Sequence, residues 1–450
     1  MSIKPGTCAF LTLGCRVNQY ETQAIREKLL AAGFRERPFE EENDVYVINT
    51  CAVTGESARK SRQMIRRALR HKETNPAAIV CAAGCYTQGE GESPDDLLKR
   101  ADLLFGNTEK AKIADAILRL WARRNEAHDH IKDVGKEKKY EELTVSRSVN
   151  ARAFLKIEDG CNSFCSYCYV PLVRGRVRSR PEEDVLAEAK RLCDSGYREI
   201  VLTGIETGAY GEDLGQPDAL ARLALKLALI PGIERIRFSS LKPTVFTESF
   251  CGALAGEKKI MPHFHLSLQS GSDAVLAAMR RRYGRREEEE AIDRVRRYFP
   301  DCGLSADLIV GFPGEKETDF LETDSLIHRA ALLHTHIFPY SPRKGTLAAS
   351  MPDQVVPAVK KERAARLLES AKRASRAFAE ERTGRFYTVL CEKIVKGEAF
   401  GYTENFLYTR TPAGKTVRVG ELFPVILGEK RSFSVETMTV ICRERDRDEG

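Results

Sequence analysis

Short apolar segments alternate with amphipathic helical segments through the first 340 residues, and this alternation limits the possible folds more than any other feature. In the first 124 residues each candidate strand is followed by a helical pattern, which is typical of a doubly wound parallel sheet. The sequence therefore predicts an α/β domain over residues 1–124. Its candidate strands are Cys8–Leu13, Val45–Asn49, Ala77–Ala82 and Asp102–Phe105.

Residues 151–341 repeat the strand–helix alternation six times. Six such units predict an open (β/α)6 barrel, with its chemistry at the carboxyl ends of the strands. The candidate strands are Phe154–Ile157, Ile200–Thr203, Ile236–Ser239, His263–Ser267, Leu304–Val310 and His334–Pro339.

A long basic amphipathic segment, Val355–Arg382, follows the barrel, and beyond it the pattern changes to short β segments separated by turn residues. Such a pattern predicts a small antiparallel β-barrel of a kind that often binds RNA. The candidate segments are Phe386–Glu392, Ala399–Thr403, Phe406–Thr409, Thr416–Val419, Leu422–Leu427 and Phe433–Val440.

A chain of 450 residues is long enough for two or three domains. We expect the α/β domain over 1–124, a Lys-rich linker over 125–148, the barrel with its trailing helix over 149–382, and the small barrel over 383–450. Since no stretch approaches twenty apolar residues and the start has no apolar signal segment, the sequence predicts a cytoplasmic protein without a membrane partner. Thirteen Cys then favour metal or redox use over a disulfide framework. The net charge of +7 is compatible with a polyanionic partner.

Cys161, Cys165 and Cys168 form a Cys-x3-Cys-x2-Cys triplet just after the first barrel strand. Thiolates are the ligands of iron–sulfur clusters, and a [4Fe-4S] cluster held by three of them keeps one iron open to another ligand. The next Cys is Cys193, so the sequence does not show the four-Cys pattern of a ferredoxin. The alternative is a structural zinc site or three unrelated thiols, although zinc sites usually have four ligands.

Three strands of the first domain run directly into a Cys, namely Cys15, Cys51 and Cys85, at spacings of 36 and 34 residues. Parallel strands end on the same side of a sheet, and ligands collect outside those carboxyl ends. The three thiols are therefore predicted to converge. The alternative is that they are ordinary buried thiols, as Cys8 and Cys81 are expected to be.

The Cys161 triplet, with Tyr167 before its last Cys, resembles the motif of radical S-adenosylmethionine (SAM) enzymes. Residues 12–22, 49–54 and 84–88 resemble the three signatures of the methylthiotransferase amino-terminal domain, and residues 268–273, 310–315 and 338–343 resemble the radical SAM core of that family. The last 60 residues resemble its TRAM domain. Over nearly its whole length the chain is thus identified as a member of the methylthiotransferase family of radical SAM enzymes.

The resemblance implies two [4Fe-4S] clusters and SAM as cofactors. Cys161, Cys165 and Cys168 would hold the catalytic cluster that binds SAM and generates a radical. Cys15, Cys51 and Cys85 would hold a second cluster that carries or donates sulfur. The implied reaction replaces an unactivated C–H bond by C–S–CH3, and its implied partners include an electron donor of the flavodoxin or ferredoxin type and a sulfur source.

Within the family, the motif over residues 14–22 is most similar to that of the tRNA enzymes that act on N6-threonylcarbamoyladenosine at position 37, 3′ of the anticodon. Arg16 and Thr22 differ conservatively from the residues of that motif. This implies methylthiolation of carbon 2 of that base. The alternatives are isopentenyladenosine in tRNA, an aspartate of a ribosomal protein, or a non-catalytic iron–sulfur protein that binds RNA or transfers electrons.

Two further groups complete the predicted site. Polar residues at or near the strand ends are candidates for binding SAM: Gly204, Glu206, Ser239, Gln269 and Asp307. A run of Arg after the cluster loop predicts contacts with RNA, because guanidinium groups bind phosphates and stack on unpaired bases. The run consists of Arg174, Arg176, Arg178 and Arg180.

Overall fold

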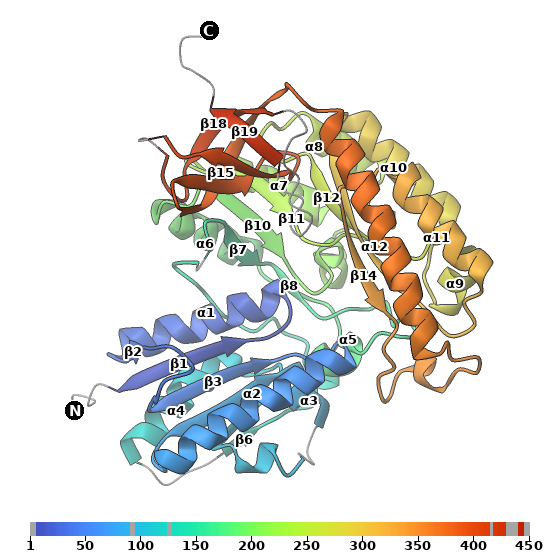
Figure 1. The fold of residues 1–450 in the computed structure, drawn as a ribbon. Coiled ribbons are helices and arrows are strands. Elements are labelled where there is room, and N and C mark those ends of the chain that lie inside the picture. Colours follow the sequence, from blue (N-terminus) through green and yellow to red (C-terminus); the bar gives the residue numbers. More distant parts are fainter. Residues whose placement is uncertain are drawn as a thin grey trace.

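The computed structural model describes residues 6–90, 95–123, 128–148, 150–414, 417–428 and 440–444. They form three units along the chain: an N-terminal parallel sheet, a six-stranded open barrel and a small closed barrel (Figure 1). Across these ranges, none of the helices combines the length and apolar character needed to cross a membrane.

The N-terminal sheet has six parallel strands in the order β2-β1-β3-β4-β5-β6. The predicted doubly wound arrangement is confirmed, because α2 (Gly55–Thr74) packs on one face while α1 (Arg16–Ala31) and α4 (Ile113–Arg123) pack on the other (Figure 1). The strands are β1 (Thr7–Thr12), β2 (Arg35–Glu36), β3 (Val45–Thr50), β4 (Ile79–Gly84), β5 (Leu103–Phe105) and β6 (His128–His130).

Two of these strands were not predicted. Strand β2 has only two residues, and β6 has three polar residues and lies in the stretch predicted as a linker. The central strand β3 is fully buried: Val45 and Val47 point to one face of the sheet, and Tyr46 and Ile48 to the other. Such two-sided burial is typical of a parallel sheet covered by helices on both faces.

The barrel consists of two parallel sheets, β11-β10-β7 and β12-β13-β14. An isolated bridge between Leu241 and Leu266 joins them, so all six predicted strands are present in one open barrel. The strands are β7 (Ala153–Lys156), β10 (Glu199–Thr203), β11 (Arg235–Phe238), β12 (His263–Gln269), β13 (Gly303–Val310) and β14 (His334–Pro339). The helices around them are α6 (Glu182–Asp194), α7 (Ala219–Ala228), α8 (Glu248–Ala255), α9 (Asp273–Ala278), α10 (Arg285–Tyr298), α11 (Glu317–Arg329) and α12 (Pro357–Glu380).

Side chains alternate between the two faces of each barrel strand. On β12, for example, Phe264 and Leu266 belong to the core that packs under the helices. Their neighbours His263 and His265 therefore face the inside of the barrel. The same alternation places polar and charged residues on the inner face of the other strands, where a substrate can reach them.

The C-terminal unit is a closed five-stranded barrel in the order β15-β16-β17-β19-β18. Its pairs are antiparallel, as predicted, except that β17 and β19 are parallel. The strands are β15 (Phe386–Val395), β16 (Glu398–Tyr402), β17 (Tyr408–Pro412), β18 (Leu422–Leu427) and β19 (Val440–Glu444). Residues 417–419, predicted as a strand with Thr416, do not form one, while Thr416 and residues 433–439 lie outside the described residues.

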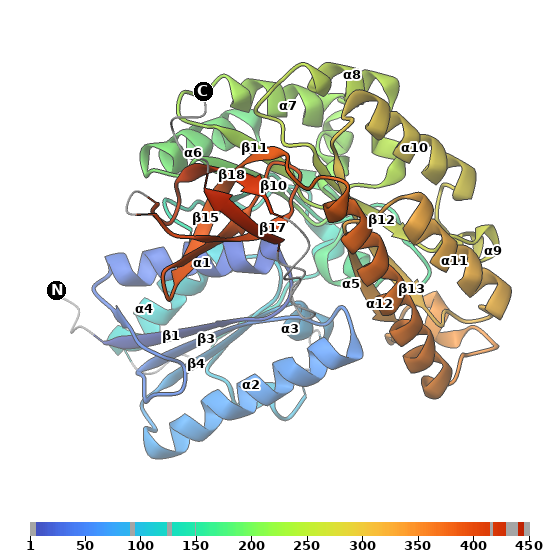
Figure 2. The ribbon, with the colours of Figure 1, turned by 45° about the horizontal axis from the view of Figure 1, so that its top comes forward.

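The small barrel packs against the amino-terminal ends of the large barrel's strands (Figure 2). The buried Arg237 of β11 donates hydrogen bonds to the carbonyl oxygens of Thr403 and Glu404 at 2.7 and 2.8 Å. The ring of Phe406 stacks on His263, the first residue of β12, with ring centroids 4.0 Å apart. The carboxyl ends of the barrel strands are thus left free for the site.

Candidate active site

The Cys161 triplet lies in a loop that a short hairpin closes. Strand β8 (Glu158–Asp159) pairs with β9 (Arg178–Ser179), and the loop between them includes α5 (Val170–Arg174). At its start Gly160 has a φ of +93°, and a Cβ atom there would overlap the carbonyl oxygen of Arg176. Only glycine suits this position, which directs the chain into the loop immediately before Cys161.

The structure brings the three thiols of this loop together. Burial, together with the neighbouring thiols of Cys165 and Cys161, raises the pKa of Cys168 to about 12. The Sγ of Cys165 accepts a hydrogen bond from Arg281 at 3.3 Å, and the Sγ of Cys161 accepts one from the backbone N–H of Ser163 at 3.4 Å. A metal cluster would displace the protons that burial holds on these thiols.

Cys15, Cys51 and Cys85 likewise gather at one edge of the N-terminal sheet. They follow β1, β3 and β4, which are neighbours in the sheet, and Cys85 opens the short helix α3 (Cys85–Glu90). Gly14 has a φ of +94°, and a Cβ there would lie 2.8 Å from the Sγ of Cys51. Loss of hydration raises the pKa of Cys51 and also that of Cys15, which keeps some exposed surface, and the thiol of Cys85 adds to each shift. The predicted convergence at the sheet edge is therefore present.

The donor type and number of each triad fit an iron–sulfur cluster. Each triad offers three thiols, Cys161, Cys165 and Cys168 in one and Cys15, Cys51 and Cys85 in the other. Thiolates are the ligands of such clusters, and three of them leave one iron of a [4Fe-4S] cube open. Among the described residues, a separate group of possible metal ligands, His265, Asp307 and His336, has ligand atoms that all lie within 4.8 Å of one another.

A group of charges that we call the buried ion network joins the segments that carry the two triads. Glu21 of α1 pairs with Arg174 at 2.6 Å, with Lys156 at 3.0 Å and with Lys110, and Asp159 pairs with Lys156 at 2.7 Å and with Arg174 at 3.1 Å. All five side chains are at most 5% exposed. Burial alone would raise the pKa of Glu21, but the three cations hold it well below its usual value.

Three cations and two carboxylates give the buried ion network a net charge of +1. The positive charge of Arg174 lowers the pKa of Cys15, and Asn107 donates a hydrogen bond to the Sγ of Cys85 at 3.4 Å. The surplus charge thus favours anionic sulfur at the N-terminal triad. Sequence reasoning did not identify the network, although Asn18 and Glu21 lie on the buried face of α1, where helical periodicity predicts apolar residues.

Four of the five residues predicted to bind SAM lie at strand ends. Gly204 follows β10, Ser239 follows β11, and Gln269 ends β12 with a φ of +74°. The backbone N–H of Glu206 donates to the carboxylate of Glu158 at 2.8 Å.

The side chain of Glu206 pairs with Lys242 at 3.1 Å on one oxygen, while its other oxygen, Oε1, is buried without a hydrogen-bond partner among the described residues. Burial raises the pKa of Glu206. An unpaired buried carboxylate oxygen at this strand end fits the ammonium group of SAM.

Asp307 differs from this group. It lies three residues before the end of β13, and it accepts hydrogen bonds from His265 and His336, both at 3.1 Å. Burial opposes ionisation, but these two imidazoles hold the pKa of Asp307 well below its usual value. The assignment of Asp307 to the SAM site is not supported, because its carboxylate is engaged on the inner face of the barrel.

The prediction that the Arg run binds RNA is wrong for three of its four members. Arg174, Arg178 and Arg180 are buried: Arg174 belongs to the buried ion network, Arg178 donates to backbone carbonyls, and Arg180 pairs with Glu188 at 2.8 Å. Arg176 is exposed, with its guanidinium 4.3 Å from the ring centroid of Phe164. The three buried Arg residues of the run therefore anchor the cluster loop to the protein interior. Alternating Arg residues can pair inward as well as outward.

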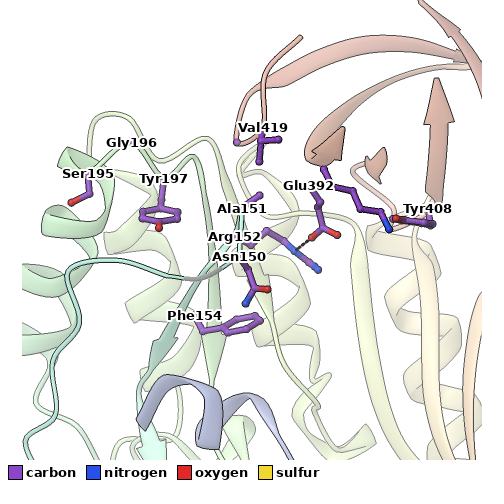
Figure 3. A pocket seen from close by; sticks show the side chains of 12 residues that line it. Asn150, Ala151, Arg152, Phe154, Ser195, Gly196, Tyr197, Glu392, Tyr408 and Val419 are labelled. Atoms are coloured by element: carbon purple, nitrogen blue, oxygen red, sulfur yellow. Dashed lines mark ion pairs between the residues drawn. The ribbon is translucent and has the colours of Figure 1, made fainter. Parts of the chain in front are cut away.

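Two clefts differ in their relation to the thiols. A cleft of about 250 Å³ beside Cys165 is lined by Lys242, Arg280 and Arg282. A larger cleft of about 540 Å³ separates β7 and the loop before β10 from the small barrel, and Arg152 and Glu392 pair across it at 2.8 Å (Figure 3). Among the described residues, no Cys lines the larger cleft, whereas Cys165 lines the smaller one, so the thiol chemistry belongs there.

Comparisons with known proteins agree with this geometry. Residues 155–327 match the Radical SAM superfamily, and residues 7–106 match Uncharacterized protein family UPF0004. "Threonylcarbamoyladenosine tRNA methylthiotransferase MtaB" of Bacillus subtilis (strain 168) is 38% identical, covering 92% of this chain and 93% of that protein. The protein of the same name from Aquifex aeolicus is 39% identical, covering 93% of this chain and 99% of that protein. The chain belongs to the radical SAM methylthiotransferase family.

Members of this radical SAM methylthiotransferase family need not share a substrate. "tRNA-2-methylthio-N(6)-dimethylallyladenosine synthase" of Thermoanaerobacter sp. (strain X514) is 36% identical, covering 94% of this chain and 91% of that protein. Among solved structures, the radical SAM methyltransferase TsrM of Kitasatospora setae has a TM-score of 0.53 at 14% identity, covering 76% of this chain and 77% of that chain, which shows a shared fold.

As a radical SAM methylthiotransferase, the protein uses SAM and two [4Fe-4S] clusters. The clusters supply one-electron chemistry and, at an open iron, a coordination position for SAM or sulfur.

Proposed function

We propose that the protein adds a methylthio group to carbon 2 of N6-threonylcarbamoyladenosine at position 37 of tRNA, in the cytoplasm. The similarity to the two relatives named MtaB and the motif over residues 14–22 support this substrate. The dimethylallyladenosine synthase of Thermoanaerobacter has almost the same identity, so the N6 substituent is the point that an experiment must decide.

In this proposal Cys161, Cys165 and Cys168 hold the cluster that binds SAM, and Cys15, Cys51 and Cys85 hold the cluster that supplies sulfur. Gly204 permits close packing in the strand-end turn, because a Cβ there would overlap the carboxylate of Glu158. Glu206 then presents its unpaired oxygen to the ammonium group of SAM. Ser239 and Gln269 complete the polar rim at the next strand ends.

The protein side of the proposed tRNA contact is basic. Arg280 and Arg282 are exposed at the cleft beside Cys165, and Arg176 is exposed on the cluster loop. Exposed guanidinium groups on several segments can bind the phosphates of a folded RNA. An electron donor of the flavodoxin or ferredoxin type and a sulfur source are the remaining proposed partners.

The observation that carries the proposal is that one buried ion network joins the two segments that carry the two sets of three thiols. A single cluster would suffice for radical generation alone. A second triad with its own open iron gives sulfur a place to bind before its transfer.

The test is nucleoside analysis by mass spectrometry of tRNA from a host that lacks this modification, with and without the protein. We expect 2-methylthio-N6-threonylcarbamoyladenosine to appear with the wild-type protein and to be missing with Cys85→Ala. Cys81→Ala is the matched control, since Cys81 is a buried thiol outside the triad, in the strand β4 that directly precedes Cys85. A methylthio group on dimethylallyladenosine, or on no nucleoside at all, would contradict the proposal.

A further inference from the structure

The side chain of Arg16 extends from the N-terminal domain into the barrel. It is the first residue of α1 and follows Cys15 directly. Its Nη1 donates a hydrogen bond to the hydroxyl of Ser239 at 3.3 Å, and its guanidinium lies 5.6 Å from the ring centroid of Phe154. Phe154 belongs to β7 and lies at the base of the larger cleft (Figure 3). One side chain therefore connects the N-terminal triad with the inner face of the barrel.

The charge of Arg16 has no direct counterion. Within the described ranges, no carboxylate oxygen lies within 4.0 Å of its guanidinium, and its one hydrogen bond goes to a neutral hydroxyl. Arg174, Lys156 and Arg237, which are buried more deeply than Arg16, each pair with a carboxylate. A partly buried cation without an anionic partner is unfavourable unless a ligand supplies the anion.

The nearest acidic groups do not fill this position. Glu199 and, more weakly, Asp307 attract Arg16 only at longer range. Glu199 already pairs with Arg237 at 2.8 Å, and the carboxylate of Asp307 is bound by two imidazoles. Arg152 repels Arg16 and is paired with Glu392 across the larger cleft. An incoming carboxylate would therefore find the guanidinium of Arg16 unpaired, while the charged residues around it already have partners.

Arg16 also lies between the two thiol triads. Ser239, its hydrogen-bond partner, donates in turn to the hydroxyl of Thr203 at 3.1 Å. Thr203 ends β10 directly before Gly204, at the strand ends where SAM is expected. A substrate that approaches both triads would thus pass beside the guanidinium of Arg16.

We infer that Arg16 binds a carboxylate on the N6 substituent of the substrate base and thereby determines which substituents are accepted. This inference rests on the proposed function, in which the substituent is threonylcarbamoyl. Threonylcarbamoyl carries a carboxylate at neutral pH, whereas a dimethylallyl group is apolar. A carboxylate forms charge-assisted hydrogen bonds with the guanidinium, while an apolar group leaves that cation enclosed and unpaired.

The test pairs a protein change with a substrate change. Wild-type protein and Arg16→Gln are each given two anticodon stem–loop RNAs, one with N6-threonylcarbamoyladenosine and one with its methyl ester, which lacks the charge. For the carboxylate RNA, Arg16→Gln should lower kcat/KM at least tenfold, mainly through a higher KM. For the ester RNA the two proteins should differ less than threefold, and Arg16→Lys should retain part of the preference.

Two controls separate this role from a structural one. Gln19→Ala changes an exposed residue in the same first turns of α1 and should alter neither rate. The iron content of Arg16→Gln shows whether its clusters are loaded, and the two proteins are compared at equal iron content. If Arg16→Gln fails to load its clusters, a competition experiment with the wild-type protein still tests the inference. The ester RNA should inhibit modification of the carboxylate RNA at least tenfold more weakly than additional unreacted carboxylate RNA does.

Equal loss on both RNAs, or no loss on either, would overturn the inference and leave Arg16 a residue that only docks α1 onto the barrel. Equal inhibition of the wild-type protein by the two RNAs would overturn it as well. Failure of the wild-type protein to modify the carboxylate RNA at all would instead refute the proposed function, so the two failures are distinguishable.

Discussion

Replacing Glu21 by Gln should destabilise the protein more than any single surface change. Glu21 is the carboxylate partner of Lys110, Lys156 and Arg174 at once, and its side chain is 1% exposed. Without its charge, Lys156 and Arg174 would keep only the carboxylate of Asp159, and Lys110 would lose its ion-pair partner. Removing one partner from a buried ion pair costs about 3–5 kcal/mol.

The expected loss is measurable as a shift in thermal unfolding of the full-length, cluster-loaded protein. At roughly 2–4 °C per kcal/mol for a large cooperative unit, a loss of about 3–5 kcal/mol lowers the melting temperature by roughly 6–20 °C. Lys110 has no other carboxylate within ion-pair distance in the described residues. Lys110→Met added to Glu21→Gln should therefore recover part of the loss, because it removes the cation left unpaired.

Glu56→Gln is the matched control. Glu56 pairs with Arg59 on the surface of α2, where both side chains are more than half exposed, and such pairs contribute less than about 1 kcal/mol. The reasoning is refuted if Glu21→Gln shifts the melting temperature no more than Glu56→Gln. It is also refuted if the effects of Glu21→Gln and Lys110→Met simply add.

Three further predictions follow from buried groups. Burial raises the pKa of Glu141 to about 7. The contribution of this carboxyl group to stability is therefore complete below about pH 4.5 and is lost as the pH rises through 7. Glu141→Gln should raise the melting temperature relative to the wild type at pH 8 but not at pH 4.5. Arg281→Met removes a hydrogen bond and a positive charge from the Sγ of Cys165, so a redox titration followed by electron paramagnetic resonance should show a lower potential for that cluster, by on the order of 60 mV. Arg237→Met removes the contacts of β11 with the carbonyl of Thr403, so limited proteolysis should release the small barrel faster; an unchanged rate would contradict this contact's role.

The placement of the Cys residues could be predicted because it follows from chain connectivity. Cys15, Cys51 and Cys85 each come directly after a strand, and parallel strands bring their carboxyl ends to one edge. The six barrel strands were recognisable for a similar reason, since each is an apolar run between helical patterns. Short polar strands such as Arg35–Glu36 carry no such pattern, and they form because neighbouring strands offer hydrogen bonds.

The partners of charged residues could not be predicted in the same way. Arg174 pairs with Glu21, which lies 153 residues earlier in the chain. Nothing in the alternating Arg run shows whether it faces RNA or an interior carboxylate, and only the packing of α1 against the barrel decides this. The same packing carries Arg16 from the start of α1 to Ser239, a contact across 223 residues.

The measurement that tests the central claim most directly is iron content after anaerobic reconstitution, compared between the wild type and two triple variants. We expect about eight irons per chain for the wild type and about four for each triple variant. The first variant is Cys15→Ala/Cys51→Ala/Cys85→Ala, and the second is Cys161→Ala/Cys165→Ala/Cys168→Ala. Of the two variants, the first should keep reductive SAM cleavage and the second should lose it. About four irons in the wild type, or about eight in the first variant, would contradict two separate three-thiolate clusters.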